Sequence, residues 1–177
     1  MPRLSDAKLR ALRELSLESV TRVWLETDTR FWEARGESGG GESDLALGGL
    51  RDEGAGKPGE HGILGLYANR AASQLLSASS DAERIEAALA HAERFHPDVR
   101  AHVTGTASKC WDSDPFQRGA FAYFEPGQVT GLAPHLSRPE GKLHFAGDHT
   151  SLRPGFMHGA LASARRVLEE IDPPPGS

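Results

Sequence analysis

The sequence has little that would tie the chain to a membrane, a disulfide framework or a nucleic acid. Its single cysteine, Cys110, cannot form an internal disulfide, which fits a reducing compartment. No apolar run approaches the roughly 20 residues of a membrane-spanning helix, and residues 1–8 lack the apolar stretch of a signal peptide. Lys and Arg number 20 against 25 Asp and Glu, with no basic stripe to bind nucleic acid. We therefore expect a cytoplasmic protein with no membrane or nucleic-acid partner.

Several functional motifs are missing as well. The chain has no Gly-x-Gly-x-x-Gly that opens a helix, and the glycines at 39–41 lie in a predicted loop. His91 and His96 are five residues apart and do not share a helix face, so no metal site is expected. Neither Ser151 nor Ser163 lies in a nucleophile elbow, which argues against hydrolase chemistry.

Local patterns predict a mixed α/β chain of 177 residues, 38% of them hydrophobic. Strands are predicted at residues 20–27, 61–67, 99–106 and 142–146. Helices are predicted at residues 6–15, 69–76, 80–95 and from Pro154-Gly155 onward, with Ser5 capping the first and Ser80 or Asp81 the third. Residues 36–59, rich in glycine, are predicted to be loop. The last helix places apolar residues at a period of 3.6. Its Arg165-Arg166 and Glu169-Glu170 predict a solvated face with i,i+4 ion pairs.

Two segments together resemble the flavin-containing amine oxidases, which include monoamine, polyamine and L-amino-acid oxidases. The first runs from Trp111 to Phe121 (WDSDPFQRGAF). The second combines residues 143–150 (LHFAGDHT) with residues 154–163 (PGFMHGALAS). The family has there a strand ending in F-A-G-E/D, a short loop, and a helix opening G-aromatic-M/I-x-G-A. Weaker matches at residues 2–8, 22–25 and 31–32 make the resemblance colinear from residue 2 to about residue 171.

The resemblance implies an architecture. Residues 1–105 would be the second half of a substrate-binding domain, with the glycine-rich loop at 36–59. Residues 106–177 would add the C-terminal strand and helix of a Rossmann-like FAD domain. The family's dinucleotide fingerprint lies near its amino terminus, so this chain lacks the main pyrophosphate site. We therefore expect the N-terminal portion or subunit of the same oxidase as its partner, and no activity from the chain alone.

The resemblance also implies roles for particular residues. The expected cofactor-binding residues are Trp111, Gly147, Asp148, Gly155, Phe156 and Met157, with backbone amides at the start of the last helix facing the flavin. Phe121 and Phe156 match the two aromatic residues that flank the substrate. Ala120 falls near the position of the flavin-linking cysteine of monoamine oxidases, so FAD is expected to bind non-covalently. Arg22 replaces the family's lysine and cannot readily act as a base, so we assign no catalytic residue.

The expected function is oxidative deamination of a small-molecule amine or amino acid, giving an imine and hydrogen peroxide. Two alternatives stay open. The chain could be a non-catalytic remnant or partner-binding subunit of the same fold, or part of another flavoprotein of this architecture, such as a desaturase or a protoporphyrinogen-type oxidase. His158 has no counterpart in these motifs, and His149 follows Asp148; both are expected to be solvated loop or helix-start residues.

Overall fold

The computed structural model describes residues 3–173, which form two compact units. Unit 1 combines residues 1–18 with residues 119–177, and unit 2 consists of residues 19–118. The boundary expected near residue 105 differs from this division, because residue 105 lies inside a strand of unit 2. The N-terminal residues join unit 1 because α1 (Asp6–Glu14) packs against α5 (Gln128–Ser137). Of the weak match at residues 2–8, Pro2 lies outside the described residues. The assignment of the two parts to substrate and FAD domains remains a prediction.

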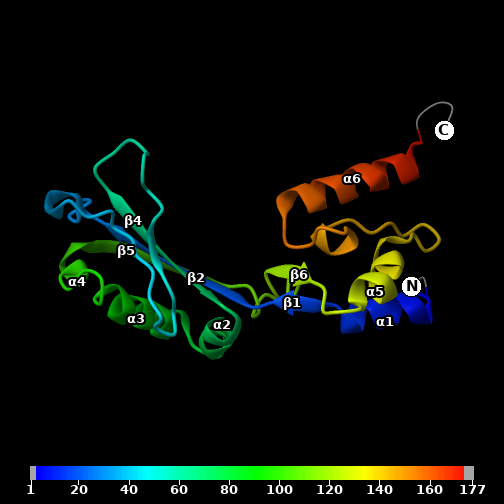
Figure 1. The fold of residues 1–177 in the computed structure, drawn as a ribbon, viewed down its shortest axis with the longest axis horizontal. Coiled ribbons are helices and arrows are strands. Elements are labelled where there is room, and N and C mark those ends of the chain that lie inside the picture. The colour runs from blue at the N-terminus through cyan, green and yellow to red at the C-terminus, as the bar shows by residue number, and fades with distance from the viewer. Residues whose placement is uncertain (1–2, 174–177) are drawn as a thin grey trace. The chain divides into compact units, whose positions relative to one another are not determined.

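Unit 2 is built on an antiparallel sheet in the order β3-β4-β2-β5, with β2 between β4 and β5 (Figure 1). The strands are β2 (Val20–Thr27), β3 (Leu50–Asp52), β4 (Gly62–Asn69) and β5 (Val103–Cys110). The predictions of strands at 20–27 and 61–67 are confirmed. Val23 pairs with Leu66 and Leu25 with Leu64, which places four buried side chains on one face. The short β3 adds a strand to the loop predicted at 36–59.

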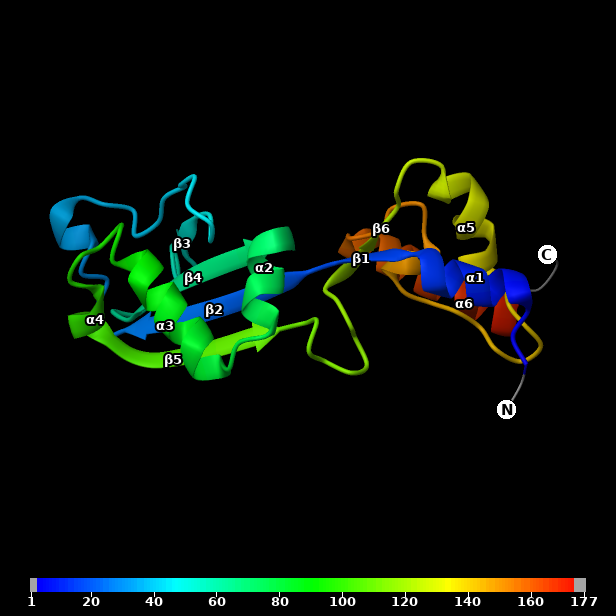
Figure 2. The same ribbon diagram turned by 90° about the horizontal axis from the view of Figure 1, so that it is seen from below.

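Two helices cover that apolar face, α2 (Arg70–Ser77) and α3 (Asp81–Ala92) (Figure 2). Ser80, one of the two predicted caps, is the N-cap of α3 and forms a reciprocal capping box with Glu83. Trp32, which is fully buried, and the short helices η1 (Glu33–Arg35) and α4 (Val99–His102) complete this end of the unit.

The prediction of a strand at 99–106 is wrong in its first half. Val99 is fully buried at the start of α4, and pairing with β2 begins only where Val103 meets Thr27. The Ala101 N–H donates to the Asp98 carbonyl, closing a single helical turn after Pro97. Val99 therefore packs in a turn of helix, whereas Val103, Thr104 and Thr106 lie in β5.

Unit 1 contains α1, α5, a two-stranded antiparallel sheet and α6 (Met157–Ile171). The sheet pairs β1 (Ser16–Glu18) with β6 (Phe121–Tyr123), and Leu17 lies opposite Ala122. Ala11, Leu132 and Leu136 form the buried core between α1 and α5. A short helix, η2 (Asp148–Thr150), precedes α6. The sequence indicates α1 and α6 correctly, including the Ser5 cap, but β1, β6 and α5 are not predicted.

Residues 142–146 do not form the predicted strand. An isolated bridge joins Glu140 to Leu143, and within the described ranges no neighbouring strand pairs with residues 144–146. A strand needs such a neighbour to satisfy its backbone groups. The mixed α/β class is otherwise confirmed, and in the described part of the chain no helix is long and apolar enough to cross a membrane.

Candidate functional site

The Asp148 carboxylate joins three segments of unit 1 at the start of α6. Its Oδ2 atom accepts the backbone N–H of Ala122 at 3.1 Å and that of Gly155 at 2.9 Å. Ala122 follows Phe121 in β6, and Gly155 precedes Phe156. One carboxylate oxygen thus ties together the backbone beside both predicted cage residues.

Gly155 also lies directly against Phe121. Its φ is +78°, a left-handed conformation that L side chains rarely adopt. A Cβ at this position would come within 3.0 Å of Phe121 Cδ2. The glycine therefore permits both the turn before α6 and the close approach of the Phe121 ring.

The first turn of α6 is open. Phe156 is the N-cap residue and supplies no side-chain cap, and its ring is 64% exposed. Within residues 3–173, the N–H groups of Met157 and His158 have no hydrogen-bond acceptor. Unpaired amides and the positive end of the helix dipole make this helix start suitable for a negatively polarised group. The Met157 side chain beside them is exposed.

Gly147 is tied to α6 from the other side. Its N–H donates to the Ser163 hydroxyl oxygen at 2.8 Å, and that buried hydroxyl donates to the Ala160 carbonyl at 2.6 Å. Thr150 donates its hydroxyl to the Gly147 carbonyl at 2.9 Å. Gly147 itself has φ +133°, and a Cβ there would meet the His149 ring. The Gly-Asp pair is therefore held in a fixed loop.

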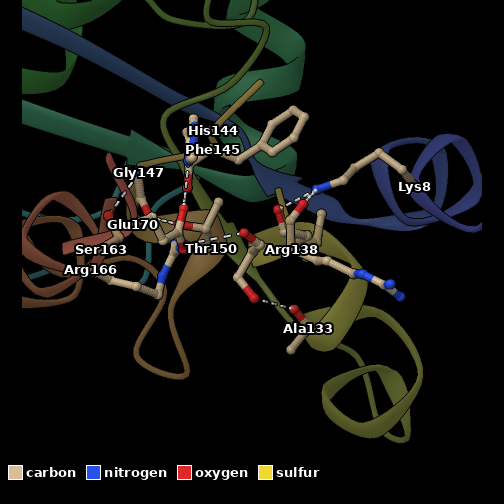
Figure 3. A network of polar contacts seen from close by, with 12 residues as sticks. Lys8, Ala133, Arg138, His144, Phe145, Gly147, Thr150, Ser163, Arg166 and Glu170 are labelled. Carbon is tan, nitrogen blue, oxygen red and sulfur yellow. Dashed lines mark hydrogen bonds and ion pairs between the residues drawn. The ribbon is translucent and has the colours of Figure 1, made fainter. Parts of the chain in front are cut away.

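Arg166 anchors the segment that precedes this loop (Figure 3). Its guanidinium donates to the Phe145 carbonyl at 2.7 Å, the Ser137 carbonyl at 3.2 Å and the Thr150 hydroxyl at 3.3 Å. It also pairs with Glu170, whose pKa is lowered by the hydrogen bond to His144 first and by Arg166 as well, against burial. Both predicted i,i+4 pairs form: Arg165 and Glu169 are exposed, whereas Arg166 and Glu170 are only half-exposed, because the Arg166 guanidinium turns to these carbonyls.

Lys8 supports the same segment from α1 (Figure 3). It is 1% exposed, and its Nζ donates to the carbonyls of Leu136 and Arg138 at 2.8 and 2.9 Å. The ammonium lies 3.5 Å from the centre of the Phe145 ring. Burial lowers the pKa of Lys8, while Glu140 opposes that effect. Lys8 was noticed only within a weak motif, and no local pattern indicates that it is buried.

Two histidines near the site differ in their surroundings. His149 lies in the short helix η2, as a loop or helix-start residue should, and its side chain is 35% exposed. Burial lowers its pKa more than the nearby Asp148 raises it. His158 is exposed, and its ring stacks on Phe156 with centroids 5.5 Å apart. The described part of the chain holds no cluster of three His, Cys, Asp or Glu suited to a metal ion.

The remaining predicted residues lie in unit 2. Trp111 follows β5, is half-buried and donates its backbone N–H to Val20 at 3.2 Å. Arg22 is ion-paired with Glu53, which also accepts the Trp24 Nε1–H at 2.9 Å. The rings of Trp24 and Tyr67 flank the guanidinium at 5.2 and 5.1 Å, and burial lowers the pKa of Arg22. Arg22 is therefore held by a carboxylate and two aromatic rings.

Comparison with known proteins places the chain among flavoproteins. The family described as flavin containing amine oxidoreductase matches residues 1–171. The putative L-amino-acid oxidase YobN of Bacillus subtilis (strain 168) is 36% identical over 93% of this chain and 35% of its own length. An L-amino-acid oxidase of Siganus canaliculatus is 37% identical over 97% of this chain and 33% of its own length.

Solved structures agree on the fold. A putrescine oxidase triple mutant has a TM-score of 0.80 at 23% identity, over 95% of this chain and 38% of that chain. Cyclohexylamine oxidase from Brevibacterium oxydans has a TM-score of 0.76 at 22% identity, over 96% and 39% of the two chains. The fold class is that of the FAD amine oxidases. The chain belongs to the flavin-containing amine oxidoreductase family and spans about a third of the curated relatives it matches.

Proposed function

We propose that this chain is the C-terminal part of an FAD-dependent amine or amino-acid oxidase. The complete enzyme would convert an amine and dioxygen to an imine and hydrogen peroxide. The observation that carries the proposal is the meeting of Phe121, Asp148 and Gly155 at the open start of α6. These residues come from two distant segments that carry the resemblance to the family, and both segments lie within the matched residues 1–171.

The residues present fit a flavin. The unpaired amides of Met157 and His158 would donate to its electron-rich edge. Asp148 Oδ1, which makes no hydrogen bond in the described part of the chain, could accept one from a ribityl hydroxyl. When bound, the flavin supplies the acceptor for the hydride equivalent that leaves the amine carbon. With alanine at position 120, we expect FAD to be held without a covalent bond.

The chain's own contribution is binding and orientation. Phe121 and Phe156 offer apolar ring surface to a neutral amine. Arg22 is already paired with Glu53 and stays charged, so it would not take a proton from the substrate. We therefore assign no catalytic base to this chain.

The partner we propose is the N-terminal portion of the same oxidase. The side of α6 that carries Met157, Leu161, Leu168 and Ile171 is exposed, at 85%, 71%, 67% and 62%. These positions are spaced by four, seven and three residues and form one apolar stripe along the helix. A stripe of this kind normally packs against a partner, and the chain has about a third of the length of its curated relatives.

Co-expression of the chain with its N-terminal portion tests the proposal. We expect a yellow complex that releases peroxide with at least one member of a panel of amines and L-amino acids. Leu161→Lys should prevent assembly, because it puts a charge into the stripe, whereas Leu75→Lys, on α2 and similarly exposed, should not. A colourless, inert complex would favour the alternative that the chain is a non-catalytic remnant of the same fold. Full FAD binding and turnover by the chain alone would contradict the need for a partner.

A further inference from the structure

We propose that Asp148 is the positioning residue that sets Phe121 and Phe156 in place. The inference rests on the proposed function, in which the two rings line the path of the substrate. It assigns the carboxylate a task beyond contact with the cofactor, since Oδ2 is occupied by the protein's own backbone.

Beside Phe121, the hydrogen bond from Ala122 to Asp148 takes the place of a strand that β6 lacks on one edge. β6 is three residues long and pairs with β1 on one edge only, in a two-stranded sheet. On the other edge the Ala122 N–H donates to Asp148 Oδ2 at 3.1 Å. The carboxylate therefore takes the place of a neighbouring strand directly after Phe121 and limits how far β6 can move.

Beside Phe156, the hydrogen bond from Gly155 to Asp148 determines where α6 begins. Gly155 donates its N–H to the same oxygen at 2.9 Å, one residue before the N-cap Phe156. Hydrogen bonds to a charged acceptor are stronger than neutral ones, so one anionic oxygen can hold both amides. Because both donors converge on a single atom, any displacement of Asp148 shifts both ring positions together.

The two oxygens of Asp148 then have different tasks. Oδ2 holds the backbone, whereas Oδ1 is 3.9 Å from His149 Nδ1 and the side chain is 26% exposed. Asparagine at this position could keep a carbonyl oxygen on the two amides while losing the charge. Alanine would leave both amides without an acceptor. The pair of variants therefore separates tethering from mere loss of a side chain.

Amide hydrogen exchange in the full 177-residue chain tests the tie without relying on activity. In Asp148→Ala we expect the Ala122 and Gly155 amides to exchange at least about tenfold faster, and together. Asp148→Asn should recover part of the protection. The Glu125 amide, bound to Gln128 Oε1 at 2.9 Å in the same unit, should not change. Unchanged exchange at Ala122 and Gly155, or equal acceleration at Glu125, would overturn the proposal.

Kinetics of the assembled oxidase then show whether the tie serves the substrate. With FAD saturating, we expect Asp148→Ala to raise KM for a bulky apolar amine on the order of tenfold, more than for a small one, with kcat changed less. Asp148→Asn should restore most of that loss, and Asp172→Ala, an exposed aspartate after α6, should have no effect. A purely cofactor-binding role would change FAD affinity but not KM at saturation, which would overturn the inference. If the complex is inactive but the Ala122 and Gly155 amides still exchange faster together in Asp148→Ala, the proposed oxidase function is refuted and the positioning role of Asp148 stands.

Discussion

Replacing Gly155 with alanine should destabilise unit 1 for two separable reasons. The backbone at Gly155 has φ +78°, where an L residue costs about 1–2 kcal/mol. The new methyl group would also come within 3.0 Å of Phe121 Cδ2. Overpacking of this kind costs roughly 1–3 kcal/mol, and the lower end applies because Phe121 is only half-buried and can move. The expected total is about 2–3 kcal/mol.

Gly127→Ala is the matched control. Gly127 also belongs to unit 1 and has φ +85°, but a Cβ there would meet nothing within 4 Å. It should therefore lose only the backbone share, about 1–2 kcal/mol. Since each 1.4 kcal/mol is a tenfold change, the slowest amides of unit 1 should exchange roughly 5–30 times faster in Gly127→Ala. In Gly155→Ala they should exchange roughly 30–150 times faster by the same conversion.

Hydrogen exchange with mass spectrometry is the suitable assay, because Trp24, Trp32 and Trp111 all lie in unit 2 and their fluorescence does not report on unit 1. A double-mutant cycle completes the test. In a Phe121→Ala background, Gly155→Ala should cost no more than Gly127→Ala does. If the two glycine variants are equally destabilised with Phe121 intact, the ring does not pack against Gly155 and the site geometry is wrong.

Three further changes test the supports of the two units. Ser80→Ala removes the side-chain cap of α3, at about 1 kcal/mol, and should lower the melting temperature of unit 2, followed by tryptophan fluorescence, by roughly 4–8 °C; an unchanged melting temperature would argue against the capping box. Arg166→Met should destabilise unit 1 by about 1–2 kcal/mol, measured by hydrogen exchange; the value is kept low because solvent screens this half-buried ion pair. Arg165 is 84% exposed, so Arg165→Met should change the stability by no more than about 0.5 kcal/mol. Because burial lowers the pKa of His149, unit 1 should lose stability as pH falls below about 6.5, where the unfolded chain takes up a proton that the folded chain resists. Exchange measured across that range should be flatter in His149→Gln but not in His158→Gln; equal slopes would exclude this cause.

The elements predicted correctly are those whose pattern is complete within a few residues. Val20–Thr27 is rich in β-branched and aromatic residues, and Ser80 provides an N-cap at the start of α3. Gly155 before an apolar period indicates α6. Each of these signals is local, so it survives without knowledge of the rest of the fold.

The misses depend on distant partners. Residues 142–146 have the composition of a strand but lack a strand to pair with in the described part of the chain. Lys8 is buried because the carbonyls of Leu136 and Arg138, 128 and 130 residues further along the chain, accept hydrogen bonds from its ammonium. The hydrogen bond between Asp148 and Ala122 joins residues 26 positions apart. Its donor is a backbone amide, which the pattern of side chains does not reveal. The motif could indicate Asp148 as a site residue, but not what its oxygens hold.

The two faces of α6 explain how unit 1 can present its site. In an ordinary surface helix the apolar face is covered and the polar face is solvated. Here the covered side carries Gly159, Ser163 and Arg166, while Leu161 and Leu168 are exposed. The inner side is joined by hydrogen bonds to Phe145, Gly147 and Thr150, in a segment that forms no strand in the described part of the chain. Polar contacts thus fix the helix start and its preceding loop, which leaves the apolar side available for the partner that we propose.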